Sequence, residues 1–167
     1  MGGWVRAKKG ESEVGIAMLR QGLADWSATG AETHRTYFEG LLAEALGDAG
    51  DYNAAISLCN GALGRKHGAG AVFHIAELHR LKGEFLLRQG GASGDAEKCF
   101  REALAIATKQ RAKSLELRAA MSLCRLYQSQ GRPTDARTIL AERYAWFTEG
   151  FTTPDLQDAR HLLEQLA

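Results

Sequence analysis

The sequence predicts an all-α protein built as a stack of helix hairpins, and three observations carry this prediction. Valine, which favours strands, occurs only at positions 5, 14 and 72, and no segment alternates apolar and polar residues over the length of a strand. Alanine, leucine, glutamate, arginine and glutamine, which favour helices, dominate the chain. A turn that opens a new helix returns about every 40 residues, which is typical of helical repeat proteins.

Four segments have this form of a turn followed by a helix, and each carries a small residue at the same place in the helix. The turns are at Gly10, Gly50, Gly94 and Gly131. The small residues are Gly15, Ala55, Ala96 and Ala136, which lie 40, 41 and 40 positions apart. This regular spacing indicates repeats that pack one against the next.

The residues that follow each small residue also recur, in the order small, bulky, small at the spacing of one helix face. The three complete examples are Gly15, Leu19 and Gly22; Ala55, Cys59 and Ala62; and Ala96, Phe100 and Ala103. The fourth repeat departs from the order, because Arg143 stands where a small residue is expected. Helices approach closely where small side chains face bulky ones, so this face is predicted to pack within the hairpin.

Upstream of the fourth small residue, the helix carries Leu123, Cys124 and Tyr127 at helical spacing. With the small-bulky-small order, this resembles the tetratricopeptide repeat (TPR), whose two helices carry Leu-Gly-x-x-Tyr and Ala-x-x-x-Phe-x-x-Ala. The resemblance implies a right-handed superhelical stack of about four hairpins. A period of about 40 also fits HEAT or armadillo arrays, but the recurring order favours the TPR-like interpretation.

The element boundaries follow from the apolar periodicity and from the turn residues. We expect helices at 2–9, 12–28, 32–48, 52–65, 72–89, 94–109, 113–130 and 133–147. A ninth helix, which caps the stack over 153–167, should begin with Thr153 as its N-cap and Pro154 in its first turn. Its Leu156, Leu162, Leu163 and Leu166, with Phe151, would close the last hairpin.

These elements predict a single repeat domain over 1–167, with repeats at about 1–29, 30–68, 70–110 and 112–148. The stretch before Gly10 is about half as long as the first helix of the other repeats, so we expect the chain to be a fragment of a larger protein. Upstream residues would then cover the face that carries Trp4 and Val5, and this end could otherwise self-associate.

A second resemblance rests on the residues of 76–87, 96–107, 116–126 and 146–156. These segments are similar to the C-terminal repeat region of large bacterial signalling proteins. Such proteins join a class III adenylate or guanylate cyclase, or a DNA-binding domain, to a signal-transduction ATPase and then to these repeats. The resemblance implies a regulatory module, and it carries over no catalytic residue.

Charge, hydropathy and cysteine content exclude several classes of function. The 21 basic and 20 acidic residues leave a net charge of +1, so bulk electrostatics would hold neither nucleic acid nor a membrane surface. No apolar run approaches the roughly 20 residues of a membrane span, and no export signal is visible, so we expect a cytoplasmic protein. Three widely spaced cysteines argue against a disulfide framework.

No motif for catalysis, metal or cofactor binding is present. The glycine-rich segments at 61–66 and 90–94 lack the Gly-Lys-Ser/Thr that cradles phosphate, and are interpreted as loops. His74 and His79 are five residues apart, whereas zinc-binding helices use a spacing of four. Cys59, Cys99 and Cys124 fall in or beside the packing positions, where a thiol acts as a small apolar group. We therefore predict no enzyme activity, no metal and no cofactor.

A partner is expected in the concave groove, which the first helix of each hairpin lines in TPR stacks. The residues mapped onto that face are Tyr37, Leu41, Glu44 and Asp48, then Glu77, Arg80, Leu81, Glu84 and Arg88, then Arg118, Met121, Arg125 and Ser129. The groove would grade from acidic to basic, and ligand carboxylates would pair with Arg118 and Arg125. Some of these charges are also i, i+4 neighbours, which stabilise a solvated helix without any ligand.

The predicted function is therefore a non-catalytic module that binds a peptide or a neighbouring domain, with no nucleic acid or membrane partner. The alternative is a domain that senses a small inducer between its repeats, which would need a cavity lined by polar and aromatic groups. Trp146, Phe147 and Phe151 form the richest aromatic cluster, which we interpret as core between the last repeat and the capping helix, with a docking patch as the alternative.

Overall fold

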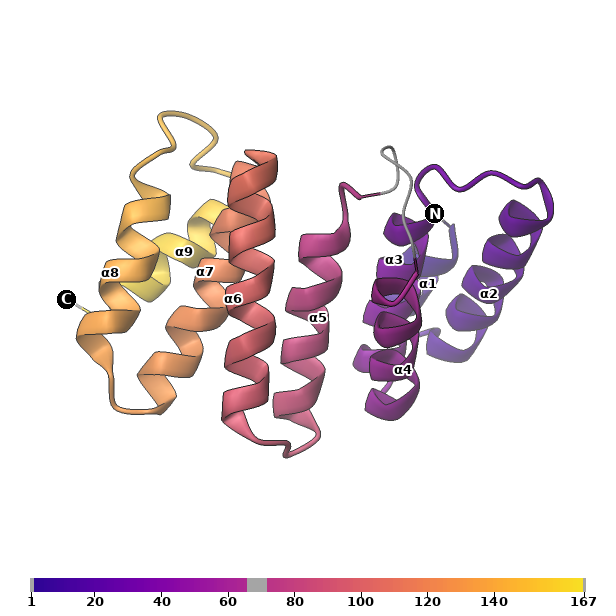
Figure 1. Ribbon diagram of the computed structural model, residues 1–167, viewed down its shortest axis with the longest axis horizontal. Coiled ribbons are helices and arrows are strands. Elements are labelled where there is room, and N and C mark those ends of the chain that lie inside the picture. Colours follow the sequence, from indigo (N-terminus) through magenta and orange to yellow (C-terminus); the bar gives the residue numbers. More distant parts are fainter. Residues whose placement is uncertain (1, 66–71, 167) are drawn as a thin grey trace.

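The computed structural model describes residues 2–65 and 72–166, and these form nine α-helices and no strand (Figure 1). The helices are α1 (Gly2–Lys8), α2 (Ser12–Ala28), α3 (Arg35–Asp48), α4 (Tyr52–Leu63), α5 (Ile75–Arg88), α6 (Ser93–Gln110), α7 (Lys113–Ser129), α8 (Pro133–Tyr144) and α9 (Pro154–Glu164). The predicted boundary between the second and third repeats, at 68–70, and the final residue, 167, lie outside the described residues.

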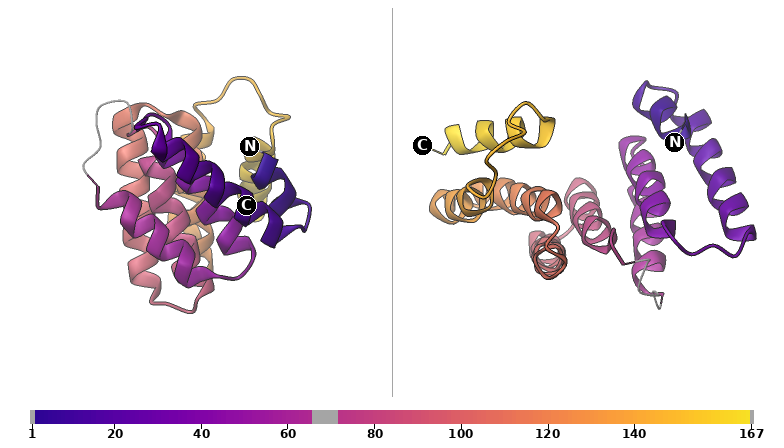
Figure 2. Two further views of the ribbon diagram at one scale, coloured as in Figure 1. Left: turned by 90° about the vertical axis from the view of Figure 1, so that its right-hand side faces the viewer. Right: turned by 90° about the horizontal axis from the view of Figure 1, so that it is seen from above.

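The helices form two layers, because alternate helices differ in what they contact. Each helix packs against the next one in the chain, and α1, α3, α5, α7 and α9 also contact one another in that order. Among the described residues, no contact joins α2, α4, α6 and α8 to one another. The odd-numbered helices therefore form an inner layer and the even-numbered helices an outer layer. Viewed from above, the stack is an arc from which α1 and α9 project on the same side (Figure 2).

Small residues bring the paired helices together, as the sequence pattern predicts. Ala55, Ala96 and Ala136 are fully buried, and so are the bulky residues Cys59 and Phe100 four positions after the first two. In the first repeat the pattern holds only in part. Gly15 packs against the backbone of α1, so that a Cβ atom there would lie 2.5 Å from the Gly3 carbonyl oxygen, but Gly22 faces open space. The short α1 does not reach Gly22.

The turns that separate the hairpins use glycine where the chain takes a left-handed conformation. Gly50 (φ +83°) ends the turn before α4, where the Asp51 side chain accepts a hydrogen bond from the Ala54 amide at 3.0 Å. In the third repeat this role falls to Gly90 (φ +81°), whereas the predicted turn residue Gly94 lies inside the first turn of α6.

Several predicted helix boundaries shift by three residues, among them the start of α5, which lies at Ile75 instead of residue 72. Two of these shifts have a visible cause or consequence. α3 begins at Arg35 instead of residue 32, because His34 takes a left-handed conformation (φ +65°) that a continuous helix excludes. α8 ends at Tyr144 instead of residue 147, and the chain turns away through an irregular segment that leads to α9. This early end exposes Trp146.

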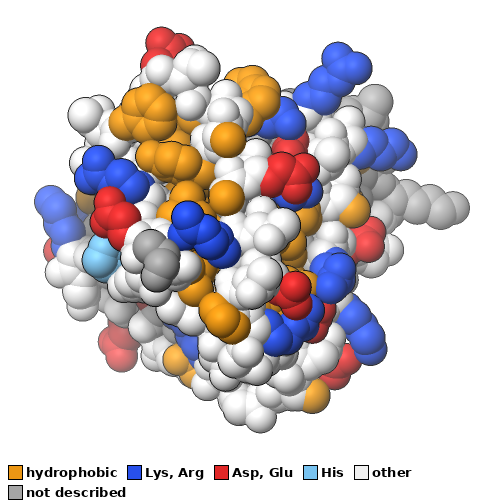
Figure 3. Space-filling view, turned by 90° about the vertical axis from the view of Figure 1, so that its left-hand side faces the viewer, with side chains coloured by type: hydrophobic (Ala, Val, Ile, Leu, Met, Phe, Trp, Pro, Cys, Tyr) orange, Lys and Arg blue, Asp and Glu red, His pale blue; other side chains and the backbone are white. Residues whose placement is uncertain are grey.

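The aromatic cluster at the C-terminal end is only partly core, which corrects the interpretation made from the sequence. The side chains of Trp146 and Phe151 are 58% and 43% exposed, and Phe147 alone of the three is half-buried against the last core cluster. The burial of this end is instead supplied by Leu156, Ala159 and Leu162 of α9. Apolar side chains accordingly gather on the C-terminal face of the molecule (Figure 3).

Within the described residues, no helix is both long and apolar enough to cross a membrane.

Candidate functional site

The candidate site is a cavity of about 540 Å³ on the concave side of the arc. Every one of its lining residues lies on α1, α3, α5, α7 or α9, except His74, which directly precedes α5. They are Trp4, Tyr37, Gly40, Leu41, Glu44, His74, Glu77, Arg80, Leu81, Arg118, Met121, Arg125, Asp155 and Asp158. The inner layer thus supplies the whole site, and the projecting helices α1 and α9 stand at its two ends.

Nine of the residues mapped onto the groove from the sequence line this cavity. They are Tyr37, Leu41, Glu44, Glu77, Arg80, Leu81, Arg118, Met121 and Arg125. The other mapped residues, Asp48, Glu84, Arg88 and Ser129, do not line it. Each of these four lies in the last turns of its helix, and the cavity is built from the earlier turns. The pattern therefore identifies the helix face that lines the cavity, but not the extent of the cavity along that face.

Five lining residues were not foreseen, and they come from two sources. Trp4, Asp155 and Asp158 lie on the terminal helices α1 and α9, to which the inner-face mapping was not applied. Applying the same mapping to these helices is the signal that could have found them. Gly40 and His74 form a contact that no linear pattern reveals: a Cβ atom on Gly40 would lie 2.9 Å from the His74 ring, so only glycine leaves room for that ring.

A buried ion-pair network forms the floor of the cavity. Arg80 donates two hydrogen bonds to Glu77, from Nε at 3.0 Å and from Nη2 at 2.8 Å, and it also contacts Glu84 at 3.4 Å. The Ser122 hydroxyl of α7 donates to the same Glu84 oxygen at 2.7 Å. Burial alone would raise the pKa of Glu77, but the charges of Arg80 and Arg118 and the hydrogen bonds from Arg80 keep that pKa below its usual range. The floor is thus charged yet internally compensated.

The helix α1 neutralises the acidic end of the groove. The Trp4 indole donates to Glu44 at 2.7 Å, and the Lys8 ammonium contacts Glu44 at 3.0 Å and Asp48 at 2.6 Å. Among the described residues, Arg88 also approaches Asp48, at 3.8 Å. The expected acidic character of this end is therefore largely cancelled by a helix of the same chain.

The helix α9 neutralises part of the charge at the basic end of the groove. Arg118 donates from Nε to Asp155 at 2.7 Å and lies 3.7 Å from Glu77. A ligand carboxylate would thus meet an arginine that already has two carboxylate partners. The expected grade from acidic to basic is accordingly replaced by a groove whose charges are mostly paired within the protein.

An aromatic cluster borders the cavity where α3 and α5 begin. Tyr37 stacks on Phe73 with ring centroids 6.4 Å apart and meets the edge of His74 at 5.1 Å. Phe73 remains 42% exposed. Burial lowers the pKa of His74, so its ring is neutral near pH 7, and its nitrogens can donate or accept a hydrogen bond. This border is suited to apolar or aromatic groups of a ligand.

This architecture, of helix hairpins whose inner helices line one groove, defines a helical repeat protein of the TPR-like class. It is similar to crystal structures of the nearly identical TPR-like repeats of a Podosopora anserina protein described as a putative kinesin light chain. The TM-scores are 0.66 for that structure and 0.67 for a variant of it with one substitution, and both match 98% of this chain and 81% of theirs at 18% sequence identity. At this identity the likeness shows the fold, which is the TPR-like one.

One sequence relative is an uncharacterized protein of Rhizobium meliloti (strain 1021), which is 32% identical over 121 residues. The match spans 72% of this chain but only 12% of the relative's length. No family model matches the chain.

Proposed function

We propose that this chain is a non-catalytic interaction module that binds an extended peptide segment of a protein in its concave groove. The observation that carries the proposal is the cavity itself, which all five inner helices line and to which none of the described outer helices contributes. TPR-like folds present such surfaces to partner proteins. The groove of this chain is lined by apolar, aromatic and charged side chains, which suits the mixed side chains of a peptide.

The composition of the cavity favours binding over nucleophilic catalysis by a hydroxyl, thiol or amine side chain. The described residues that line it include no serine, threonine, cysteine or lysine that could act as a nucleophile. Its buried carboxylate, Glu77, is fixed in an ion pair with Arg80 and is therefore poorly placed to accept a proton from a substrate.

The first experiment is selection of peptides from a library of random dodecapeptides, followed by affinity measurement with two matched variants. Leu41→Arg places a long charged side chain in the cavity, and Leu58→Arg makes the same change at a half-buried position of the outer helix α4. We expect Leu41→Arg to lose peptide binding and Leu58→Arg to retain it. Circular dichroism should show that both variants are folded. Equal affinity of both variants for every selected peptide would overturn the proposal.

A second candidate is a sensor for a small molecule, and one observation favours it. The cavity volume of about 540 Å³ lies within the range of roughly 300–1,000 Å³ typical of small-ligand sites, and α1 and α9 bound it at both ends. A thermal-shift screen of metabolites tests this candidate. A compound that raises the melting temperature of the wild type and of Leu58→Arg, but not of Leu41→Arg, would support it.

The wider context we propose is a cytoplasmic signalling protein of several domains, in which this module relays the state of a partner to an ATPase or cyclase domain. Its support is the resemblance of the repeat segments to such proteins, together with the much greater length of the Rhizobium meliloti relative. The test is to express the longer polypeptide that contains this module and to measure its nucleotide turnover with and without a selected peptide. Unchanged turnover at saturating peptide would contradict it.

A further inference from the structure

Two charged residues of the cavity are left over when the ion pairs are assigned. Glu44, Glu77, Arg80, Arg118 and Asp155 each have a partner of opposite charge within the described chain. Arg125 of α7 and Asp158 of α9 line the same cavity, are exposed, and form no ion pair with each other or with any other described residue. One positive and one negative group are therefore available to a ligand.

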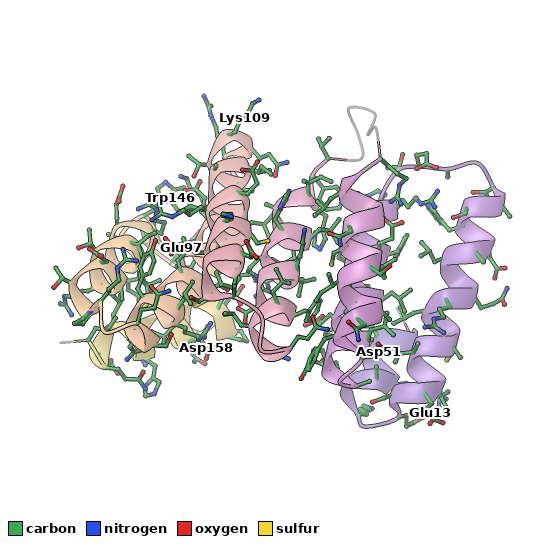
Figure 4. All side chains as sticks on the ribbon, turned by 60° about the horizontal axis from the view of Figure 1, so that its bottom comes forward. Glu13, Asp51, Glu97, Lys109, Trp146 and Asp158 are labelled. Atoms are coloured by element: carbon green, nitrogen blue, oxygen red, sulfur yellow. The ribbon has the colours of Figure 1, made fainter. Side chains whose placement is uncertain are left out.

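Both residues line the same cavity, and the contact between Arg118 and Asp155 joins the two helices that carry them. Arg125 lies two helical turns beyond Arg118, and Asp158 lies one turn beyond Asp155, and these two earlier residues hold α7 and α9 together at 2.7 Å. Figure 4 shows Asp158 on α9, at the opposite end of the molecule from Glu13 of α2. A second, unpaired set of charges thus lies on the same two helices.

A ligand with charge of only one sign would satisfy only half of this set. A purely acidic peptide would pair with Arg125 but would be repelled by Asp158, and a purely basic peptide would meet the reverse problem. Arg118, which the sequence suggested as a second carboxylate anchor, is occupied by Asp155. The remaining chemistry selects a ligand that carries both signs.

We infer that the groove is specific for a peptide segment of mixed charge, in which an acidic side chain pairs with Arg125 and a basic side chain pairs with Asp158. This inference rests on the proposed function and names the class of its ligand. Arg118 and Asp155 then act as positioning residues, because they join the two helices that carry the recognition pair. Apolar side chains of the same peptide reach the border formed by Tyr37 and Phe73.

The test uses the peptides selected from the dodecapeptide library against the wild-type chain. We expect the selected sequences to carry an acidic and a basic residue at a recurring separation. Arg125→Gln and Asp158→Asn should each weaken binding of the selected peptides by about three- to tenfold. Loss of an exposed charge pair costs up to about 1 kcal/mol, or about fivefold, and partial burial by the peptide raises that value. Arg20→Gln and Glu13→Gln remove exposed charges from the outer helix α2 and should change affinity less than about twofold.

A charge reversal gives a sharper result. The chain with both Arg125→Asp and Asp158→Arg should bind the selected peptides poorly, and should prefer versions in which the acidic and basic residues have been exchanged. Circular dichroism should show the wild-type helix content, since neither residue is buried.

The outcomes separate this inference from the proposed function. If the selected peptides lose affinity for Leu41→Arg but bind Arg125→Gln and Asp158→Asn as tightly as the wild type, the groove binds peptides and the mixed-charge inference is wrong. If no selected peptide responds to Leu41→Arg, the proposed function itself fails. Preference of the reversed chain for the exchanged peptides supports both.

Discussion

The two faces of the inner helix α5 differ in composition: one is apolar and the other is charged. On the face toward the neighbouring helices, Leu78 and Phe85 are buried among apolar side chains, with Phe85 held against Gly47 of α3. On the groove face, Glu77, Arg80 and Glu84 form a polar network that reaches α7 through Ser122. One helix thus carries packing residues on one side and the polar network of the groove on the other, because i, i+3 and i, i+4 spacing separates the two sets of residues.

The difference between these faces concerns what a substitution changes. On the packed face, volume decides, because interiors are close-packed and a missing or added methyl group is felt. On the groove face, charge decides, and most charges are already paired within the protein. Substitutions on the first face should therefore change the free energy of unfolding, and those at exposed positions of the second should change binding more than stability.

Removal of a core ring should give the largest loss of stability. Phe100 of α6 is fully buried and packs against Gly83 of α5, so Phe100→Ala should cost about 3–5 kcal/mol of unfolding free energy. Phe151→Ala, at a site where the ring is 43% exposed, is the matched control and should cost much less. Urea denaturation followed by circular dichroism measures both. Equal losses would mean that the packed face does not dominate stability.

Addition of a single methyl group on the packed face should have the next largest effect. A Cβ atom on Gly83 would lie 2.5 Å from Cε1 of Phe100, so Gly83→Ala should destabilise the chain by about 1–3 kcal/mol. Gly22→Ala adds the same atom inside α2 where nothing lies within 4 Å, and should stabilise by about 0.5–1 kcal/mol. The opposite signs are measured in the same urea titrations, and a gain in both variants would contradict tight packing at Gly83.

The packed face is also the part of the fold that the sequence predicted best. Small and bulky residues at fixed spacing carry enough information to place Ala55, Cys59, Ala96 and Phe100 in the core, because helix approach depends mainly on side-chain size. A break that depends on backbone conformation was missed. The left-handed His34 arises from local geometry that periodicity does not encode.

The groove was predictable in position but not in charge. Its helix face follows from the hairpin pattern, yet the pairing of Lys8 with Glu44 and Asp48, and of Arg118 with Asp155, joins residues 36 to 40 positions apart. Such pairs depend on how the terminal helices fold back onto the groove. Sequence alone therefore suggested Arg118 and Arg125 as equivalent anchors, whereas the structure leaves Arg125 as the unpaired one.

The buried carboxylate of the groove floor should make stability depend on pH. Because the pKa of Glu77 is lowered in the folded state, its contribution is complete above the unfolded carboxyl pKa of about 4.3 and is lost as the pH falls through the folded value. Glu77→Gln should cost about 1–3 kcal/mol at pH 7 and flatten the acid limb of the stability curve. Glu149→Gln, in an exposed loop, is the control and should leave that limb unchanged.

The measurement is urea denaturation at a series of pH values from about 8 downward. If Glu77→Gln and the wild type lose stability in parallel as the pH falls, Glu77 does not titrate with the folding transition and the ion pair with Arg80 contributes little. Burial also lowers the pKa of His74, so its contribution to stability is complete above the unfolded imidazole pKa of about 6.5 and declines as the pH falls below that value. The loss that His74 causes therefore begins at a higher pH than the loss that Glu77 causes.

The contact between Arg118 and Asp155 should give the smallest change in stability, because both side chains are partly exposed. Asp155→Asn should cost about 0.2–1 kcal/mol, and part of that loss comes from removing an acidic residue from the first turn of α9. A double-mutant cycle with Arg118→Gln isolates the pair, since only the interaction between the two residues appears in the coupling energy. Glu164→Gln with Arg160→Gln, at a more exposed pair on the same helix, is the reference cycle and should show weaker coupling. Should both cycles give zero, the packing of Leu156, Ala159 and Leu162 holds α9 in place, and the charge pair across the groove does not contribute to the fold.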